Sequence, residues 1–423
     1  QRLLSAILFS LVQYAILALT FYMPVTQCHL CASKDLVKIL DLGFHPLADF
    51  FPKEHQLMGP ERRYPLFVVL CRTCGYAMNG FVVSGEERYQ ENDYSFESGN
   101  SKVASAHFAE MAESVVVRAN LKKGDLVVDI GSNVGAFLLA FKSLGMDVQG
   151  VDPAPNIAAI AEKNGVPTIC DFFNESASKK ILGKGKVKAI TAVNCFNHIA
   201  YLDEFMECIA STLHENGVFM IESPHLLQLL ERMQFDTVYH EHVSYLAVKP
   251  LAQYFKKFGL AILHVDENDY LGGVIRLFVG RGKEDDSVQK FIAREEAAKL
   301  FDENTYVSFA KKVLNCKLKL LQDLIEARTQ GGKIVAIGAA AKGNTLLNYC
   351  GIDNSFIDLA TDISPLKIGK YTPGSHIPIR ADEAIDESVT HALILAWNLA
   401  EFLKGKISPK HPNLKFITPH VLD

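Results

Sequence analysis

Hydrophobic and polar positions alternate in blocks along residues 96–245, and the blocks predict strands separated by helices. A helix-like segment, SKVASAHFAEMAESVV, precedes an apolar run, DLVVDIG, and the helical stretch GAFLLAFKSLG follows. The same order returns in MDVQGVDP and PNIAAIAEKNG, and two further apolar runs are KAITAVN and GVFMIES. Strands that alternate with helices of this length are typical of a parallel sheet with helices on both faces.

The regions on either side of this pattern differ from it. Residues 26–95 are rich in turns and aromatic side chains and show no long helical periodicity. After residue 250 a second alternating series begins with GGVIRLFVG, continues through a long polar helical segment over 284–330, and includes GKIVAIGAAAKGNTLLNYC and HALILAWN. We therefore expect three units, at residues 26–95, 96–250 and 251–423, which suits a chain of 423 residues.

Residues 1–25 form a separate apolar segment. Residues 3–25 contain no charged side chain and are long enough to cross a bilayer. A membrane anchor is one interpretation of this segment. An artefact of the chain start, because the sequence begins with Gln1, and a cleaved signal are the alternatives.

Composition narrows the class of protein. Hydrophobic residues make up 49% of the chain and charged residues 22%, as in an ordinary globular protein. A net charge of -5 gives no broad basic face, which argues against a nucleic-acid partner but leaves room for one bound phosphate. Of the nine cysteines, four form two pairs and the rest are scattered, which argues against a disulfide framework and favours a reducing compartment.

The two cysteine pairs have the spacing of metal ligands. Cys28 and Cys31 form one C-x-x-C knuckle, and Cys71 and Cys74 form the other. The tight turn of each knuckle lets both sulfurs reach one ion, so the four residues predict a tetrahedral zinc site. Four sulfur ligands leave no open position, and the zinc would therefore be structural. A redox role would need a thioredoxin-like setting, which is absent.

A glycine turn follows the first predicted strand, in VVDIGSNVGAF. Gly131 lets the chain turn, and Gly135 lets a ligand or the helix backbone come close. Asp152 ends the next predicted strand, where a carboxylate can accept from both hydroxyls of a ribose. A dinucleotide site shares this arrangement, but Asn133 stands where its G-x-G-x-x-G pattern requires glycine. Asp129 at the strand end would repel a pyrophosphate and suits a cationic amino-acid group.

This glycine turn, D-x-G-S-N-x-G, resembles the first motif of class I methyltransferases that use S-adenosylmethionine (SAM). In that interpretation Asp171, Phe172 and Phe173 are available to bond and to sandwich the adenine. We therefore favour SAM as the cofactor. An NAD-dependent sugar-nucleotide oxidoreductase is the alternative.

The stretch FDTVYHEHVSYL, at residues 235–246, gathers two histidines, a glutamate and two tyrosines. In an extended strand His240 and His242 would share one face and Tyr239 and Glu241 the other, whereas in a loop this alternation need not hold. Taken alone, the stretch suits a metal site, a solvated loop or acid–base chemistry about equally.

The same stretch, with the cysteine pairs and with GAAAKGNTLLNYCGID, LKIGKYTPGSHIPI and LAWN, closely resembles one family, the SAM-dependent C-methyltransferases of nucleotide-linked deoxysugars. The resemblance covers roughly residues 26–420. It implies an α/β chain in which a class I, Rossmann-like SAM-methyltransferase domain is flanked by a small N-terminal zinc-binding module and a C-terminal Rossmann-like α/β domain. It also implies a thymidine-diphospho-keto sugar as substrate and a cytoplasmic location, with membrane association through residues 3–25 as the alternative.

Carried over onto this sequence, the resemblance implies roles for five residues. His242 corresponds to a general base, and Tyr239 and Glu241 correspond to its companions. His198, in NCFNHIAYLDEF, and Tyr94, in NDYSFESGNS, correspond to a further active-site histidine and a substrate-facing tyrosine. The base would remove a proton beside the sugar ketone, and the resulting enolate carbon would take the methyl group of SAM.

A second glycine turn, IGAAAKGNT at residues 337–345, also ends a predicted strand and opens a helix. Amides at a helix start and one lysine can hold a phosphate, so we expect Lys342 and Asn344 to contact the nucleotide sugar. A packed strand-to-helix turn is the alternative. The sequence departs from the family at Ala340, where serine is common, and at Asp152, where glutamate is common. An inactive sugar-nucleotide-binding relative is a further alternative, against which the complete YHEH argues.

Overall fold

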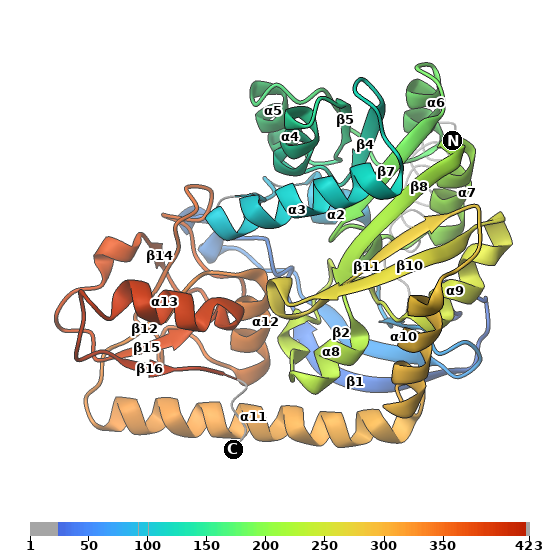
Figure 1. Ribbon diagram of the computed structural model, residues 1–423. Coiled ribbons are helices and arrows are strands. Elements are labelled where there is room, and N and C mark those ends of the chain that lie inside the picture. The colour runs from blue at the N-terminus through green and yellow to red at the C-terminus, as the bar shows by residue number, and fades with distance from the viewer. Residues whose placement is uncertain (1–23, 92, 100, 420–423) are drawn as a thin grey trace, which may run out of the picture.

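The computed structural model describes residues 24–91, 93–99 and 101–419, and within them the chain forms sheets of four, seven and five strands (Figure 1). The apolar segment predicted at residues 3–25 lies almost wholly outside the described residues. Of the helices in the described part of the chain, none is long and apolar enough to cross a membrane.

The four-stranded sheet is antiparallel. In spatial order its strands are β1 (Leu36–His45), β2 (Tyr64–Cys71), β3 (Ala77–Asn79) and β9 (Ser244–Tyr245). The last of them comes from far along the chain, directly after the YHEH stretch. In addition, the side-chain amide of Asn79 donates to the Tyr239 carbonyl at 3.1 Å. The end of β3 therefore holds the YHEH stretch at two points.

The seven-stranded sheet confirms the predicted parallel core. In spatial order its strands are β10 (Ala261–Asn268), β11 (Val274–Gly280), β8 (Leu213–Pro224), β7 (Val187–Val193), β4 (Leu126–Ile130), β5 (Asp147–Val151) and β6 (Thr168–Ile169). Strands β8 to β6 are parallel, and β11 is antiparallel to both of its neighbours. The sequence GGVIRLFVG, expected in the C-terminal unit, supplies β11 instead, because all of its strand residues are buried against this sheet.

Helices cover both faces of this sheet, as the alternating pattern predicts. The helices are α3 (Lys102–Arg118), α4 (Ala136–Ser143), α5 (Pro155–Lys163), α6 (Glu175–Leu182) and α7 (Leu202–Thr212). Val127 of β4 packs with Phe108 and Phe141 on one face, whereas Val128 packs with Ile181 and Ile209 on the other. Successive side chains of a strand point to opposite faces, so a strand that is buried on both faces is apolar throughout.

The five-stranded sheet is parallel, as predicted for the C-terminal part. In spatial order its strands are β14 (Ile379–Arg380), β13 (Leu359–Thr361), β12 (Ile334–Ile337), β15 (His391–Ile394) and β16 (Lys415–Ile417). The accompanying helices are α12 (Ala341–Cys350) and α13 (Ala400–Ile407). The long helix α11 (Glu303–Thr329) runs along the lower edge of the view in Figure 1, from below this sheet to below β1. It therefore joins the N-terminal and C-terminal parts of the molecule.

Four further α-helices of the described chain connect the sheets or pack on their edges. They are α2 (Gly85–Tyr89), α8 (Leu226–Glu231), α9 (Val248–Phe255) and α10 (Asp286–Ala297). Of these, α2 follows the cysteine-bearing sheet and carries side chains into the site described next. Its N-cap is Ser84, whose hydroxyl accepts from the Glu87 N–H at 3.2 Å.

Candidate active site

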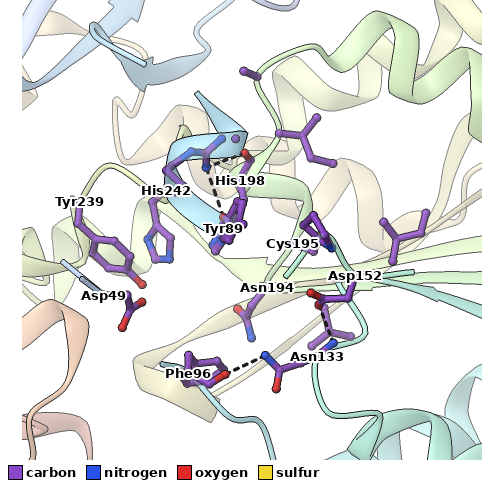
Figure 2. A pocket seen from close by; sticks show the side chains of 18 of the residues that line it. Asp49, Tyr89, Phe96, Asn133, Asp152, Asn194, Cys195, His198, Tyr239 and His242 are labelled. Atoms are coloured by element: carbon purple, nitrogen blue, oxygen red, sulfur yellow. Dashed lines mark hydrogen bonds between the residues drawn. The ribbon is translucent and has the colours of Figure 1, made fainter. Parts of the chain in front are cut away.

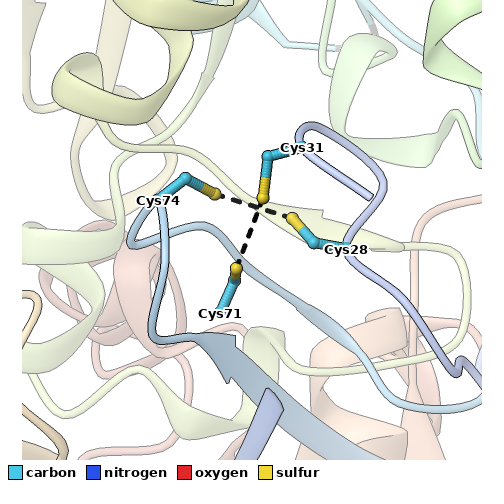
Figure 3. Close-up of side chains that lie close together, drawn as sticks. All are labelled: Cys28, Cys31, Cys71 and Cys74. Carbon is cyan, nitrogen blue, oxygen red and sulfur yellow. Dashed lines mark hydrogen bonds between the residues drawn. The ribbon is translucent and has the colours of Figure 1, made fainter. Parts of the chain in front are cut away.

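The four paired cysteines lie together (Figure 3). Their sulfur atoms are all within 4.8 Å of one another, with 3.6 Å between Cys28 and Cys74 and 3.6 Å between Cys31 and Cys71. A zinc ion with Zn–S bonds of about 2.3 Å holds tetrahedral sulfurs about 3.8 Å apart, so the cluster fits this metal. All four ligands are sulfur, which makes the site structural.

Each cysteine knuckle is closed by its own backbone. The Ala32 N–H donates to the Cys28 carbonyl at 2.9 Å, and the Gly75 N–H donates to the Cys71 carbonyl at 2.8 Å. The contact with Cys74 lowers the pKa of Cys28 to about 5. A thiol that ionises readily suits metal binding, because the thiolate is the ligand.

A cavity of about 1310 Å³ takes its lining from all three parts of the chain (Figure 2). Asp49 and Tyr94 come from the N-terminal part, Asp129 and Asp152 from the seven-stranded sheet, and Lys342 from α12. Pockets for single small ligands are roughly 300–1,000 Å³, so this cavity has room for a cofactor and a substrate together. Of the residues predicted for catalysis, cofactor or substrate, three do not line it, namely Gly135, Glu241 and Asn344.

The first glycine turn joins β4 to α4 through residues with left-handed backbone. The φ angles are +69° at Gly131, 51° at Asn133 and +81° at Gly135. A Cβ on Gly131 would lie 2.7 Å from the Cys195 sulfur, and one on Gly135 would lie 2.7 Å from the Val166 side chain. Gly135, which the pattern left open to a ligand or to the helix backbone, thus packs against Val166, whereas the turn glycine Gly131 lines the cavity.

Asp152 fixes this turn with both of its carboxylate oxygens. One oxygen accepts from the Asn133 N–H at 2.9 Å, and the other accepts from the Ala154 N–H at 3.0 Å. The Asn133 side chain in turn accepts from the Ser98 N–H at 2.8 Å and donates to the Phe96 carbonyl at 3.0 Å. Asn133 therefore holds the segment before α3 beside the cavity, which explains a polar residue in the turn.

Two carboxyl groups make this end of the cavity acidic. Asp129 accepts from the Thr191 hydroxyl at 2.6 Å. Burial raises the pKa of Asp129 to about 7 and that of Asp152 to about 6. A cationic ligand favours the charged form that burial opposes, so the pair suits a positively charged molecule. Asp171 and Phe172 complete this wall, and the Phe172 N–H donates to the Asp171 carboxylate at 2.8 Å.

Residues 239–242 form a turn instead of a strand. The His242 N–H donates to the Tyr239 carbonyl at 3.0 Å, so residues three apart, and not two apart, share a side. The rings of Tyr239 and His242 pack with centroids 4.0 Å apart and line the cavity (Figure 2). His240 lies on the other side and bonds the Pro65 carbonyl through Nε2 at 3.3 Å.

The turn removes the two-histidine metal site, because His240 and His242 do not converge on one point. Within the residues that the structure describes, the four cysteines are the one group with metal-binding spacing. His242 Nδ1 lies 2.7 Å from the Thr237 carbonyl, which can only accept, so Nδ1 carries the proton and Nε2 a lone pair. Burial, with the nearby charge of Lys342, lowers the pKa of His242 to about 4. The imidazole is therefore neutral near pH 7.

His198 lies beside His242, with ring centroids 5.0 Å apart. Its Nδ1 bonds the Tyr89 hydroxyl at 2.8 Å, and Arg88 donates to the same hydroxyl at 3.3 Å. Burial lowers the pKa of His198 well below its ordinary value, and the charges of His242 and Arg88 act in the same direction. Sequence reasoning missed Arg88 and Tyr89, because GEERYQ matches no motif.

Glu241 and Asp49 form a buried pair of carboxyl groups. Asp49 lines the cavity, whereas Glu241 lies behind it and accepts from the Asp49 N–H at 3.4 Å. Burial, with a contribution from Asp49, raises the pKa of Glu241 to about 7, and burial raises the pKa of Asp49. Sequence reasoning also missed Asp49, although an acidic residue inside the apolar run LADFF is a signal that could have found it.

The second glycine turn, between β12 and α12, brings Lys342 to the cavity. Its ammonium lies 4.4 Å from the centre of the Trp397 ring, and burial lowers the pKa of Lys342 to about 8. Asn344 points elsewhere and donates to the Ala48 carbonyl at 2.7 Å, which ties α12 to the N-terminal part. Lys367, which was not predicted, lines the same wall and donates to a backbone carbonyl at 2.8 Å.

Three protein families match the chain in succession. A zinc binding domain family matches residues 28–89, a methyltransferase domain family matches residues 103–265, and the family of the C-methyltransferase C-terminal domain matches residues 269–419. Together these matches cover nearly all of the described chain.

Individual relatives were found by sequence and by structure. C-methyltransferase NovU from Streptomyces niveus is 33% identical over 384 residues, which cover 89% of this chain and 91% of NovU. A SAM-dependent methyltransferase structure from Clostridium acetobutylicum is 16% identical and covers 43% of this chain and 94% of its own, with a TM-score of 0.35. Magnesium protoporphyrin IX methyltransferase from Synechocystis, with bound SAM, is 14% identical and covers 42% and 79%, with a TM-score of 0.32.

Proposed function

This chain belongs to the SAM-dependent C-methyltransferase family that includes NovU, and from that premise we propose that it methylates a carbon of a nucleotide-linked keto-deoxysugar. The family matches confirm the predicted class I SAM-methyltransferase fold with its zinc-binding and C-terminal α/β domains, and with the cysteine cluster they confirm SAM and structural zinc as cofactors. They also exclude the NAD-dependent alternative.

The observation that carries the proposal is a neutral histidine in the same cavity as the buried carboxyl groups of Asp129 and Asp152. A sugar carbon is not nucleophilic until a proton leaves it, and a neighbouring ketone makes that proton acidic enough for a histidine base. We assign this role to Nε2 of His242, since the bond from Nδ1 to Thr237 leaves Nε2 free to accept. Asp129 and Asp152 would hold the cofactor at the opposite wall.

The reaction follows from these positions. Nε2 of His242 takes the proton, and the electron pair of the C–H bond forms the carbon–carbon double bond of an enolate whose charge rests on the former ketone oxygen. The hydroxyl groups of Tyr239 and Tyr94 and Nε2 of His198 are the donors proposed for that oxygen. The enolate carbon would then bond to the methyl carbon that SAM supplies when bound. The sulfur–methyl bond would break, its electron pair would stay on the sulfur, and the ketone would re-form. Glu241 would support the site through Asp49.

The residues around the first glycine turn fit SAM. We propose that Asp152 accepts from the ribose hydroxyls, that Asp129 faces the amino group, and that Asp171 and Phe172 contact the adenine beside Gly131. Among the described residues neither Asp129 nor Asp152 has a lysine or arginine partner, so a cationic ligand would meet no competing charge. The zinc has no part in the chemistry, because four cysteines saturate it.

The nucleotide of the substrate would lie against the second glycine turn. The Lys342 ammonium is buried and lies over the Trp397 ring, and the charge of Asp236 also acts on it. A buried ammonium at the cavity wall attracts an anionic ligand. We propose that it meets the diphosphate, with thymidine as the expected nucleoside. Asn344 would keep the start of α12 in place through its bond to Ala48 and would not touch the sugar itself.

The decisive experiment is incubation of the zinc-loaded protein with SAM and a panel of nucleotide-linked keto sugars. Methylation adds the mass of one CH₂ unit to the product, and in heavy water the base should exchange the proton beside the ketone even without SAM. Exchange without methyl transfer would point to a misassigned cofactor site. Neither exchange nor methylation with any keto sugar would refute the substrate class and favour the inactive relative.

A matched pair of variants tests the base. His242→Asn keeps a nitrogen near the position of Nδ1 for the Thr237 carbonyl but removes Nε2, and we expect turnover to fall by at least about a hundredfold while SAM still binds. His240→Gln keeps the bond to the Pro65 carbonyl from the opposite side of the same turn, and turnover should remain. Equal losses in both variants would show that the turn, and not the imidazole, is what matters.

A further inference from the structure

Two neutral histidines lie side by side in the cavity, and the proposed reaction needs them to do opposite things. One must accept a proton from carbon, and the other must donate a hydrogen bond to oxygen. Neutral imidazole carries one proton, so the role of each ring depends on which nitrogen holds it. For His242 the Thr237 carbonyl decides, because it keeps the proton on Nδ1.

For His198, the hydrogen-bond partners of Tyr89 determine which ring nitrogen carries the proton. Arg88 can only donate, so the Tyr89 oxygen accepts from Nη1 of Arg88 at 3.3 Å. The phenol has one proton of its own, and His198 Nδ1, at 2.8 Å, is the one acceptor for it among the described residues. Nδ1 therefore accepts, and the proton of His198 is on Nε2.

The Nε2 atom of His198 is buried and has no hydrogen-bond partner in the described structure, although its ring lines the cavity. A buried donor without an acceptor costs about 1–3 kcal/mol. That cost is recovered when a ligand oxygen reaches the donor. His198 thus offers an unpartnered N–H from a ring whose centroid lies 5.0 Å from that of His242.

We propose that Arg88 and Tyr89 are positioning residues that hold His198 in the Nε2–H form, so that it donates to the enolate oxygen of the substrate while His242 alone acts as base. This inference rests on the function proposed above. Arg88 also donates to the carbonyls of His198, at 3.2 Å, and Glu241, at 3.3 Å. Arg88 therefore holds the segments that carry His198 and His242 at a fixed distance. It also determines which nitrogen of His198 carries the proton.

The charges that face His198 keep it neutral. Arg88 and His242 are the titratable groups that act on it besides Tyr89, and a positive charge on either opposes protonation. A protonated His198 would also have to donate from Nδ1, which the Tyr89 proton already occupies. The Arg88–Tyr89–His198 hydrogen-bond chain therefore disfavours a protonated, positively charged His198 next to His242.

Nitrogen-15 NMR of histidine-labelled holoprotein tests the assignment without any substrate. The signals of His198, identified by their loss in His198→Gln, should show a protonated Nε2 and an unprotonated Nδ1. In Tyr89→Phe, which keeps the ring, we expect a mixture of both tautomers. With the substrate identified by the panel, kcat should fall about tenfold to a hundredfold and KM should stay within about twofold.

Tyr306→Phe is the matched control, because Tyr306 is also buried and donates to a backbone carbonyl, that of Leu300, at 2.7 Å. It should leave kcat and the His198 signals unchanged. A protonated Nδ1 in the parent protein would overturn the proposal, as would an unchanged His198 spectrum in Tyr89→Phe or an equal loss of kcat in the control. The NMR result stands even if the substrate is a different one, so the two proposals fail separately.

Arg88 gives a second measurement if Tyr89→Phe is poorly folded. In Arg88→Gln the positive charge is gone, so the pKa of His198 should rise and the acid limb of the kcat–pH profile should move to higher pH. Arg88→Lys keeps the charge and should keep the limb in place. An acid limb at the parent pH in Arg88→Gln would contradict the proposed influence of Arg88.

Discussion

The two glycine turns of this molecule share a backbone design and differ in charge. In each turn the glycine after the strand donates to the last residue of the neighbouring strand, from Gly131 to Val151 and from Gly338 to Thr361, both at 2.8 Å. Both glycines have left-handed backbone, with φ of +69° and +82°. Both turns open a helix, α4 in one case and α12 in the other, and both adjoin the same cavity.

The residue after the neighbouring strand is an aspartate in both cases, and its partner makes the difference. Within the described residues, the partners of Asp152 are backbone N–H groups alone, so its carboxyl group keeps the cavity wall acidic. Asp362 also accepts a backbone N–H but lies 3.7 Å from the Lys367 ammonium, and Lys342 adds a second positive charge to this turn. One backbone design thus carries an acidic wall at one turn and lysines at the other, because side chains outside the glycine pattern set the charge. Under the proposed function, the first turn would hold a cationic ligand and the second an anionic one.

The variant Asp152→Asn is the strongest test of the difference in charge between the two turns. The variant keeps one oxygen for a backbone N–H but loses the charge, and we expect the Kd for SAM to rise about a hundredfold, as for lost hydrogen bonds to a charged group. Calorimetric titration measures it. Asp362→Asn is the matched control and should leave the Kd for SAM within about twofold. A similar loss of SAM affinity in both variants would mean that the first turn does not bind SAM separately from the second.

The reciprocal change is Lys342→Met at the other turn. Loss of one charged contact to a diphosphate should raise the KM for the nucleotide sugar about tenfold, whereas the Kd for SAM should not change. Steady-state kinetics at saturating SAM and a separate SAM titration check both statements. An unchanged KM with a lower kcat would place Lys342 beside the reacting atoms instead of the diphosphate.

Opposite pH dependences are the smallest of the expected effects. The pKa of Asp129 is raised to about 7, so SAM, which prefers the carboxylate, should bind several-fold more tightly as pH rises from 6 to about 7.5 and should release a proton on binding. The pKa of Lys342 is lowered to about 8, so the affinity for the nucleotide sugar should fall as pH rises above that value. Calorimetry in buffers with different ionisation enthalpies measures the protons released. SAM binding without a pH dependence would contradict the role of Asp129.

Features that are local in sequence were predictable. The C-x-x-C spacing of Cys28 and Cys31 fixes both sulfurs within one turn, and the acidic residue before Gly131 marks a strand end directly. The strand–helix alternation around β4 was likewise clear, because its strands are apolar on both faces. Such features need only neighbouring residues, so their geometry follows from the backbone.

Features that depend on distant contacts were missed or misplaced. Asp49 meets Glu241 across 192 positions of sequence, and no local pattern joins them. For His240 and His242 the sequence left a strand and a loop open, and the structure shows the loop, because the chain turns at Tyr239. Asn344, expected at the substrate, bonds Ala48 across 296 positions. Contacts and charges that distant segments of the same chain supply therefore could not be predicted from single motifs.

The bond between Asn79 and the Tyr239 carbonyl has a physiological consequence. Strand β3 begins shortly after Cys74, and its last residue supports the turn that carries His242. Removal of the metal would therefore displace the turn while leaving the SAM wall, which is built from other strands, in place. In a cell short of zinc, we therefore expect the protein to retain its cofactor and lose turnover, so that the supply of this trace metal would limit methyl transfer.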